Sequence, residues 1–146
     1  MMRRVRRSAL VPYSAQQMYD LVVDVARYPD FLPWCTGANV HEQTETELRA
    51  SIGLGFSKLN SRFSTRNELH PPECMTMQLL DGPFRSLDGR WGFEPLGTAG
   101  CEVQLQVDFE FASMAQDVLF GAGFEKICNE LIDAFVRRAN GLYGDG

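Results

Sequence analysis

The sequence lacks the residue patterns of most metal sites and disulfide frameworks. It has only two histidines, and its four cysteines, Cys35, Cys74, Cys101 and Cys128, are widely spaced, with no CxxC pair and no cluster of Cys and His. Zinc sites and disulfide-rich secreted domains need such spacings. We therefore expect buried free thiols and no metal ligands at these positions.

Long hydrophobic runs are also absent. No stretch approaches the ~18 consecutive apolar residues that a membrane-spanning helix requires. The basic start of the chain is followed by only Ala9-Leu10-Val11 before Pro12. A signal peptide needs an apolar region of roughly 7–15 residues at this place. We expect a cytoplasmic protein, with peripheral contact at the inner membrane as a further option.

The motifs of common enzyme classes are missing as well. The chain contains no GxSxG, no HExxH, no phosphate-binding glycine loop and no dinucleotide fingerprint. His41 and His70 fall near turns at predicted strand ends, where ordinary surface histidines are the simplest interpretation. A cyclase-like or hydratase-like enzyme would need an Arg, Asp or Tyr inside a cavity, and the candidates are Arg62, Arg85 and Tyr28. We expect no catalytic residue.

The charge is moderate and unevenly distributed. A net charge of −5 argues against a protein whose whole surface binds nucleic acid. However, Arg3, Arg4, Arg6 and Arg7 supply four of the 14 Lys and Arg residues. Such a cluster is usually a solvated terminal strand, and electrostatic contact with RNA or anionic lipid is the alternative.

The composition is that of an ordinary globular protein. Apolar residues make up 45% of the chain and charged residues 23%, which is incompatible with intrinsic disorder. A length of 146 residues fits one domain over residues 1–146. A domain of this size can bury a full core, or a core with a hollow in it.

The most informative segment is residues 28–35, YPDFLPWC, which places four large apolar side chains around two prolines. Proline prevents the preceding helix from continuing, yet the segment is too apolar for a bare surface loop. Its large side chains must therefore be buried, either in the core or over a cavity.

Alternation of apolar and polar residues predicts a series of β-strands. The clearest case is 101–111, where apolar residues at odd positions alternate with Glu, Gln and Asp. Side chains on a strand point to opposite faces in turn, so one face here is solvated and the other covered. Short turns between the strands imply an antiparallel meander. Weaker patterns predict further strands at 4–11, 48–54, 59–70 and 75–79 and around Trp91 and Phe93.

Two helices are predicted outside this sheet. Ser14 and Gln17 form a capping box at the start of a short one. A long one runs from Ser113 to about Ala139, with apolar residues at helical spacing. Gly121 and Gly123 each weaken its start by about 1 kcal/mol relative to Ala. Close packing against the sheet, or a first turn that moves to admit a ligand, would explain these two glycines.

Four motifs occur in order along the chain: VPYS at 11–14, YPDFLPWC at 28–35, GPF at 82–84 followed by GRWGF at 89–93, and FEKI at 124–127 leading to DAF at 133–135. Together with the order of elements they resemble the START-like coenzyme Q-binding proteins and their bacterial relatives, the ribosome association toxins, of the polyketide cyclase/dehydrase and lipid transport superfamily. The resemblance covers nearly the whole chain. It implies an α+β helix-grip fold (START-like, Bet v 1-like), with a curved antiparallel sheet wrapped around a long C-terminal helix.

The resemblance implies two functions of different class. The first is non-enzymatic binding of an apolar ligand, ubiquinone or a related isoprenoid or lipid, in support of respiratory quinone function. Ubiquinone would then be a bound ligand, and no cofactor is required. The second is toxin-like inhibition of ribosome association through a ribosomal subunit. Transient contact with a membrane surface fits the first, and a cyclase-like enzyme is a further alternative.

A carrier needs an apolar cavity with few polar groups. The chain has ten Phe, four Tyr, two Trp and six Met, and a helix on a strongly curved sheet leaves a concavity that only very large side chains fill. Core packing is the alternative for each residue taken singly. We expect a hollow of ~300 Å³ or more between the sheet and the last helix, with Trp34 at its mouth. The predicted ligand-binding residues are Phe31, Leu32, Trp34, Phe63, Met77, Phe84, Trp91, Phe93, Phe109, Phe111, Phe124, Ile127 and Leu131.

Overall fold

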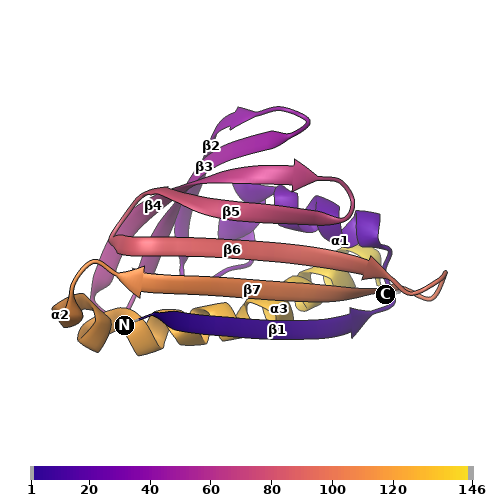
Figure 1. The fold of residues 1–146 in the computed structure, drawn as a ribbon. Helices are drawn as coiled ribbons and strands as arrows, with labels where there is room; N and C mark the ends of the chain where they lie inside the picture. The colour runs from indigo at the N-terminus through magenta and orange to yellow at the C-terminus, as the bar shows by residue number, and fades with distance from the viewer. Residues whose placement is uncertain (1, 145–146) are drawn as a thin grey trace.

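A curved antiparallel sheet of seven strands wraps around a long C-terminal helix (Figure 1). The computed structural model describes residues 2–144. The strand order is β1-β7-β6-β5-β4-β3-β2, and β1 pairs with β7 from Arg3 opposite Phe109 to Val11 opposite Cys101. This is the predicted α+β helix-grip fold. The strands are β1 (Arg3–Val11), β2 (Cys35–Gln43), β3 (Glu47–Phe56), β4 (Leu59–His70), β5 (Cys74–Asp81), β6 (Phe84–Pro95) and β7 (Cys101–Phe111).

Sequence patterning missed β2 and the first half of β6. In β2 the first residue, Cys35, is buried, while every residue from Asn39 onward is exposed. Such a strand has no apolar alternation to reveal it. In β6 an irregularity in the pairing with β7 follows Phe84, so Phe84 and Leu87 are both buried although they differ in parity. A β-bulge of this kind interrupts the period of two that sequence patterning relies on.

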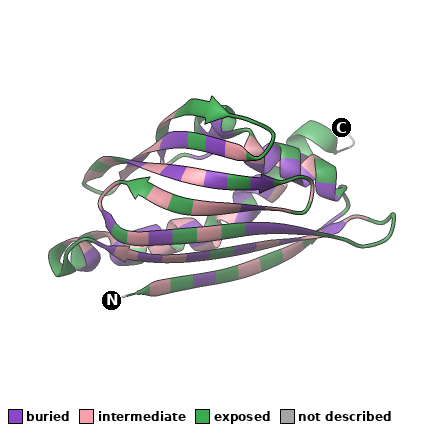
Figure 2. Cartoon of the chain, turned by 45° about the horizontal axis from the view of Figure 1, so that its top comes forward, coloured by how far each residue is buried: buried purple, intermediate pink, exposed green. Residues whose placement is uncertain are grey.

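The strands carry their apolar side chains on one face, as the alternating bands of Figure 2 show. On β7 all six odd-numbered residues from Cys101 to Phe111 are buried, and the polar residues between them are half-buried or exposed. The helix α3 (Ala122–Tyr143) lies against this concave face and buries Phe124, Cys128 and Phe135 there. The core therefore lies between the sheet and α3.

Two short helical elements connect β1 to β2. The first, α1 (Ala15–Val23), begins with the predicted capping box, because the Ser14 hydroxyl accepts from the Gln17 backbone and the Gln17 side chain accepts from the Ser14 backbone. The second is a 3₁₀ helix, η1 (Val25–Asp30), which contains Pro29. The segment 28–35 thus continues directly from η1 into β2 and supplies one side of the interior.

The C-terminal helical segment has three parts. A capping box at Ser113 opens α2 (Met114–Gln116), which leads into a π-helical stretch, η2 (Asp117–Gly121), and then α3. The predicted long helix is confirmed, and it extends to Tyr143. At Gly121 a Cβ atom would lie 2.5 Å from Nε of Arg3. A larger residue at position 121 would therefore displace the Arg3 side chain from its place across the helix.

All four cysteines are free thiols, and the prediction that they are buried holds for three of them. Cys35, Cys101 and Cys128 are buried, and Cys74 is half-buried. Burial raises the pKa of the Cys35 and Cys101 thiols, so both remain protonated near neutral pH. Within residues 2–144, no helix combines the length and the apolar character needed to cross a membrane.

Candidate ligand-binding cavity

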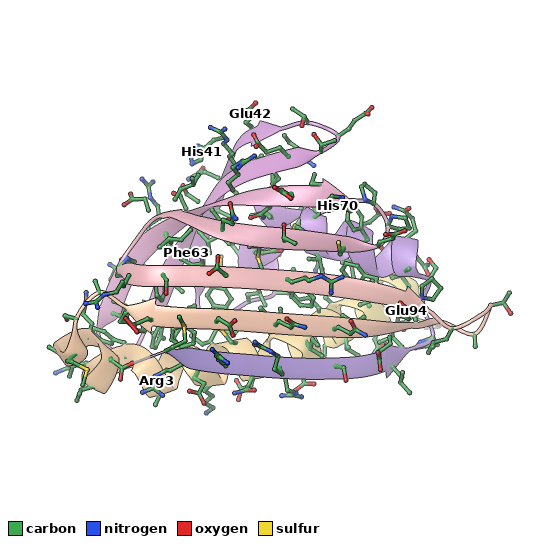
Figure 3. All side chains as sticks on the ribbon, in the orientation of Figure 1. Arg3, His41, Glu42, Phe63, His70 and Glu94 are labelled. Atoms are coloured by element: carbon green, nitrogen blue, oxygen red, sulfur yellow. The ribbon has the colours of Figure 1, made fainter. Side chains whose placement is uncertain are left out.

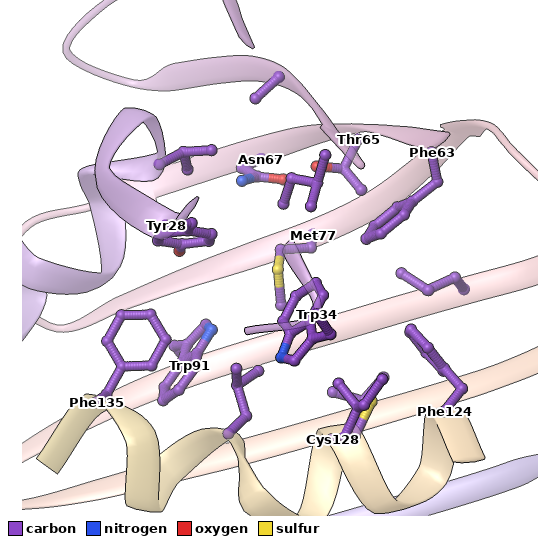
Figure 4. A pocket seen from close by; sticks show the side chains of 17 residues that line it. Tyr28, Trp34, Phe63, Thr65, Asn67, Met77, Trp91, Phe124, Cys128 and Phe135 are labelled. Carbon is purple, nitrogen blue, oxygen red and sulfur yellow. The ribbon is translucent and has the colours of Figure 1, made fainter. Parts of the chain in front are cut away.

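An apolar cavity lies between the concave face of the sheet and α3 (Figure 4). Strands β3 to β7 form one wall, α3 forms the opposite wall, and the segment 25–34 closes one side. The lining residues are Val25, Tyr28, Trp34, Ala50, Ile52, Phe63, Thr65, Asn67, Met77, Leu87, Trp91, Val107, Phe124, Ile127, Cys128, Leu131 and Phe135.

Aromatic rings close the cavity at both ends. At one end the Phe135 ring packs edge-on against Tyr28, with ring centroids 5.4 Å apart, and against Trp91 at 5.0 Å. At the other end Phe124 and Phe63 meet at 6.5 Å. Figure 4 shows these two groups on either side of the hollow. Edge-to-face contacts of this kind stabilise the fold beyond simple burial.

The cavity is smaller than the sequence led us to expect. Its volume is about 70 Å³, whereas sites for organic ligands usually measure ~300 Å³ or more. The expectation of a ligand-sized hollow is therefore wrong for this conformation. The reason lies in the middle of the interior, where the side chains of Met77 and Trp34 occupy the space between the two aromatic ends (Figure 4).

The cavity is electrically neutral. None of its lining side chains within residues 2–144 is Asp, Glu, Lys, Arg or His. The Tyr28 hydroxyl donates to the backbone carbonyl of Val22, and burial raises the pKa of Tyr28 well above its usual value. Burial, together with the nearby Glu125 carboxylate, raises the pKa of the Cys128 thiol to about 12. Neither group ionises near neutral pH, so the interior suits an uncharged molecule.

Two polar side chains interrupt this apolar lining. Thr65 and Asn67 on β4 are buried and point into the hollow, opposite α3 (Figure 4). Sequence patterning did not select them as site residues. Their positions in the strand could have identified them. Thr65 and Asn67 fall on the same face of the strand as Phe63 and Leu69, because side chains alternate between the two faces. A polar residue at an inward-facing position of a predicted strand marks a candidate site.

The predicted ligand-binding residues divide into two groups. Seven of the thirteen line the cavity: Trp34, Phe63, Met77, Trp91, Phe124, Ile127 and Leu131. Six do not: Phe31, Leu32, Phe84, Phe93, Phe109 and Phe111. The role of all thirteen in binding a ligand stays a prediction.

The six residues outside the cavity pack elsewhere for identifiable reasons. Phe84, Phe109 and Phe111 surround Phe124 on the side away from the hollow, with ring centroids 5.0, 4.8 and 6.1 Å from that of Phe124. They fill the end of the sheet with a solid aromatic cluster. Alternation on a strand identifies the inward face but not the position along it.

The other three flank the lining residues. Leu32 is fully buried in the core, and Phe93 packs edge-on against Tyr19 at 6.0 Å. Phe31 is half-buried on the outer side of Phe135, at 5.1 Å, and lies beneath the guanidinium of Arg138. Of the apolar residues in the segment 28–35, Tyr28 and Trp34 line the cavity. Burial in the core and burial over the cavity thus both occur within one short segment.

The residues proposed for cyclase-like chemistry do not form a site. Arg62 and Arg85 are exposed and lie outside the cavity lining. Tyr28 lines the cavity, but its hydroxyl is bound to Val22. Of the two histidines, His70 is exposed at the end of β4, while Nε2 of His41 lies 2.6 Å from the Ser51 hydroxyl on the outer face of the sheet (Figure 3). Of these residues, only Tyr28 borders the hollow, and its hydroxyl is already hydrogen-bonded.

The arginines of β1 are held in ion pairs to a large extent. Arg3 lies at the end of β1 that faces α2 (Figure 3). The pairs are Arg3 with Asp117 (3.0 Å) and Glu125 (3.0 Å), Arg6 with Asp108 (2.7 Å) and Arg7 with Asp133 (3.5 Å). Arg4 is exposed. The expected positive field of four free charges is therefore reduced, because three of them have acidic partners within the fold.

Residues 11–136 match the family described as polyketide cyclase/dehydrase and lipid transport. The chain belongs to this family. Among its relatives is the ribosome association toxin RatA of Vibrio cholerae, 45% identical over 144 residues, which cover 99% of this chain and all of that protein. Another is the mitochondrial coenzyme Q-binding protein COQ10 of Drosophila melanogaster, 32% identical, with 92% of this chain and 59% of that protein covered.

Two solved structures have the same fold. The Zhui aromatase/cyclase from a Streptomyces species superposes with a TM-score of 0.84 at 17% identity, over 96% of this chain and 94% of that one. A START superfamily protein from Mycobacterium smegmatis gives a TM-score of 0.75 at 22% identity, over 95% and 98%. At these identities the likeness concerns the fold alone. The START-like resemblance drawn from the motifs is confirmed.

Proposed function

We propose that this protein is a non-enzymatic carrier that binds ubiquinone, or a related isoprenoid or lipid, between the sheet and α3, in support of respiratory quinone function. The observation that carries the proposal is the neutral, largely apolar interior, whose lining includes six aromatic residues and no charged side chain within residues 2–144. Apolar walls with a few placed polar groups are typical of small-molecule sites. The relative named for coenzyme Q binding is consistent with this ligand class.

Binding of such a ligand requires the interior to widen. The volume of about 70 Å³ is too small for a quinone ring with its tail. Met77 is unbranched and adopts several rotamers at low cost, and Trp34 is only half-buried. Outward movement of these two side chains would join the hollow to solvent near Trp34. The ligand would then occupy the space that these two side chains fill in the present structure, and not a hollow that is already open.

Extraction of bound lipid tests the proposal most directly. The protein is purified without detergent and extracted with organic solvent, and the extract is analysed by mass spectrometry. We expect a quinone or isoprenoid lipid in stoichiometric amount. Added ubiquinone should also quench tryptophan fluorescence, because both Trp34 and Trp91 line the cavity. An empty extract together with unchanged fluorescence would contradict the proposal.

Ribosome association is the second candidate function. It is favoured by the 45% identity, over nearly the whole chain, to a protein named ribosome association toxin. Binding through phosphate contacts would weaken steeply with salt, because each neutralised phosphate releases counterions. Internal pairing of Arg3, Arg6 and Arg7 reduces the number of arginines free for such contacts.

The double substitution Arg4→Glu with Arg7→Glu separates the two functions. For the carrier, we expect loss of binding to anionic liposomes while soluble quinone analogues still bind, since the cavity lies elsewhere. For the ribosome-associated protein, we expect salt-sensitive co-sedimentation of the wild type with ribosomal subunits and its loss in the variant. The second result would reverse our ranking. Replacing Arg85 by Glu, at an exposed position outside β1, serves as the control for a general change of charge.

A further inference from the structure

The inward face of β4 changes from apolar to polar at two positions. Phe63, Thr65, Asn67 and Leu69 share this face, and all four are buried. A carboxamide buried without hydrogen bonds costs free energy, because it loses its bonds to water. Two apolar residues would fit the pattern of the strand equally well. The polar pair therefore needs an explanation other than packing.

Asn67 is only partly satisfied by the protein. Its side chain is buried, with 2% exposure, and its Nδ2 atom donates to the Met75 sulfur at 3.6 Å. Its Oδ1 atom accepts no hydrogen bond from any residue in the described part of the chain. A thioether sulfur can only accept, so Met75 orients the amide with its nitrogen toward β5 and leaves the oxygen unpaired. An unpaired carbonyl acceptor thus lies in an apolar, uncharged cavity.

Thr65 adds a hydroxyl to the same lining. Thr65 lies two residues along β4 on the same face and lines the same hollow (Figure 4). Among residues 2–144, the other buried side-chain atom without a partner is the Tyr19 hydroxyl, and Tyr19 does not line the cavity. Of these two unpaired atoms, only Asn67 Oδ1 therefore belongs to a residue that lines the cavity.

We propose that Asn67, assisted by Thr65, accepts a hydrogen bond from a neutral hydroxyl group of the ligand, so that the site prefers a hydroquinone to the corresponding quinone. The inference rests on the proposed carrier function and specifies the form of the ligand. A quinone carbonyl can only accept hydrogen bonds, so placing it against Asn67 Oδ1 would leave two acceptors facing each other. A hydroquinone hydroxyl donates, and it satisfies an oxygen that the protein leaves unpaired.

The test compares three ligands that share one tail and one set of ring carbons. A ubiquinone with a short isoprenoid tail, its hydroquinone and the dimethyl ether of that hydroquinone are titrated under anaerobic conditions, with tryptophan fluorescence as the readout. We expect the wild type to bind the hydroquinone about tenfold or more tightly than the other two, the effect of pairing a buried acceptor in place of leaving it unpaired. The ether keeps the aromatic ring and the oxygens of the reduced form and lacks the donors, although each of the two methylated oxygens is bulkier by a methyl group.

Asn67→Leu assigns the preference to this oxygen. Leucine fills a similar volume without polar atoms, so we expect equal affinity for all three ligands. We also expect an unchanged or higher melting temperature, because a buried unpaired acceptor is removed. A merely structural asparagine would instead lower the melting temperature and leave the affinity ratio intact. Leu69→Met is the matched control, since it alters the same face of β4 outside the cavity lining without changing a polar group, and it should keep the preference.

The possible failures are distinguishable. If the wild type binds hydroquinone, quinone and ether equally, or if Asn67→Leu retains the preference, the assignment to Asn67 is wrong and the carrier function stands. If none of the three compounds binds the wild type, the carrier function fails, and this inference fails with it. Should Asn67→Leu not fold, Thr65→Val and the ratio measured for the wild type still decide the question.

Discussion

The start of the C-terminal helical segment, residues 113–121, and the later turns of α3 are held in different ways. At its start, Val118 and Leu119 are 77% and 69% exposed. Further on, Ile132 and Phe135 of α3 are 0% and 1% exposed. Both regions are apolar in sequence and helical in structure. Burial against the sheet stabilises α3, while the start has large apolar side chains that contribute little to the core.

The start of the segment depends on a few specific contacts. The Asp117 carboxylate pairs with Arg3 at 3.0 Å, and the Phe120 ring meets Phe56 at 6.3 Å. A π-helical turn links the two parts, and such turns occur often at functional positions. Stability is therefore unevenly distributed along one continuous helix, and the start should open at a lower free-energy cost than α3. Both glycines are closely packed, because a Cβ atom would lie 2.5 Å from Nε of Arg3 at Gly121 and 2.8 Å from the Phe56 ring at Gly123. Close packing therefore explains these two glycines better than a first turn that moves.

Removing a large side chain from each end should give the largest contrast. Phe135→Ala deletes a fully buried ring that contacts Tyr28, Phe31 and Trp91. We expect a loss of ~3–5 kcal/mol in the free energy of unfolding. Leu119→Ala, at an exposed position, should change it by no more than about 0.5 kcal/mol. Urea denaturation of both variants measures the difference, and equal losses would contradict the division drawn above.

Within the segment 28–35, a second pair of substitutions separates cavity lining from core. Trp34 lines the cavity and is half-buried, so Trp34→Ala should weaken quinone binding and cost less than the ~3–5 kcal/mol of a fully buried aromatic. Leu32 is fully buried and does not line the cavity. Leu32→Ala should cost ~2–5 kcal/mol and leave the quinone affinity unchanged. Melting midpoints and fluorescence titrations give both quantities, and a loss of affinity in the Leu32 variant alone would reverse the assignment.

Glycine-to-alanine substitutions near the beginning and near the end of α3 should change stability by smaller amounts. A Cβ atom at Gly141 would meet no other atom within 4 Å, so Gly141→Ala should raise stability by about 0.5–1 kcal/mol through helix propensity. At Gly123 a Cβ atom would lie 2.8 Å from the Phe56 ring. We expect no such increase in stability for Gly123→Ala, because the Phe56 ring would have to move. Thermal denaturation measures the stability of both variants. Equal stabilisation would show that the Phe56 ring moves aside without a cost in free energy.

The smallest expected effect is a pH dependence at the start of the segment. Hydrogen bonds from Arg3 hold the pKa of Asp117 below its usual value. Because the pKa is lower in the folded state than in the unfolded one, this carboxylate stabilises the fold above about pH 4, and the contribution is lost as the pH falls through its folded value. The melting temperature of Asp117→Asn should therefore fall less than that of the wild type between pH 7 and pH 3. An equal fall in the melting temperatures of the two proteins over this pH range would contradict the stabilising role of the Asp117 carboxylate.

The sequence predicted those elements in which one face is buried without interruption. Strand β7 alternates over its full length because one face covers the core, and α3 has the corresponding helical period. Strand β2 could not be found in this way, because from Asn39 onward its residues are exposed on both faces. The start of β6 was hidden by the pairing irregularity that follows Phe84.

The site was predicted less completely than the fold. Sequence patterns select residues that face the interior, but where a cavity lies along the interior depends on how large side chains from different elements meet. Phe84 and Phe124 illustrate this, since both face inward, yet only Phe124 borders the hollow. The volume was overestimated for the same reason, because Met77 and Trp34 fill space that alternation alone leaves open.

The arginines of β1 have a consequence for the protein at high concentration. The sheet does not close on itself, and β1 is one of its two outer strands. The unpaired backbone groups of such a strand can bind a strand of another molecule and start aggregation. Four of the nine residues of β1 are arginines, and charged side chains on an outer strand disfavour its pairing with a strand of another molecule. Replacing Arg4 by Val would therefore be expected to increase light scattering in concentrated solution while leaving the monomer folded.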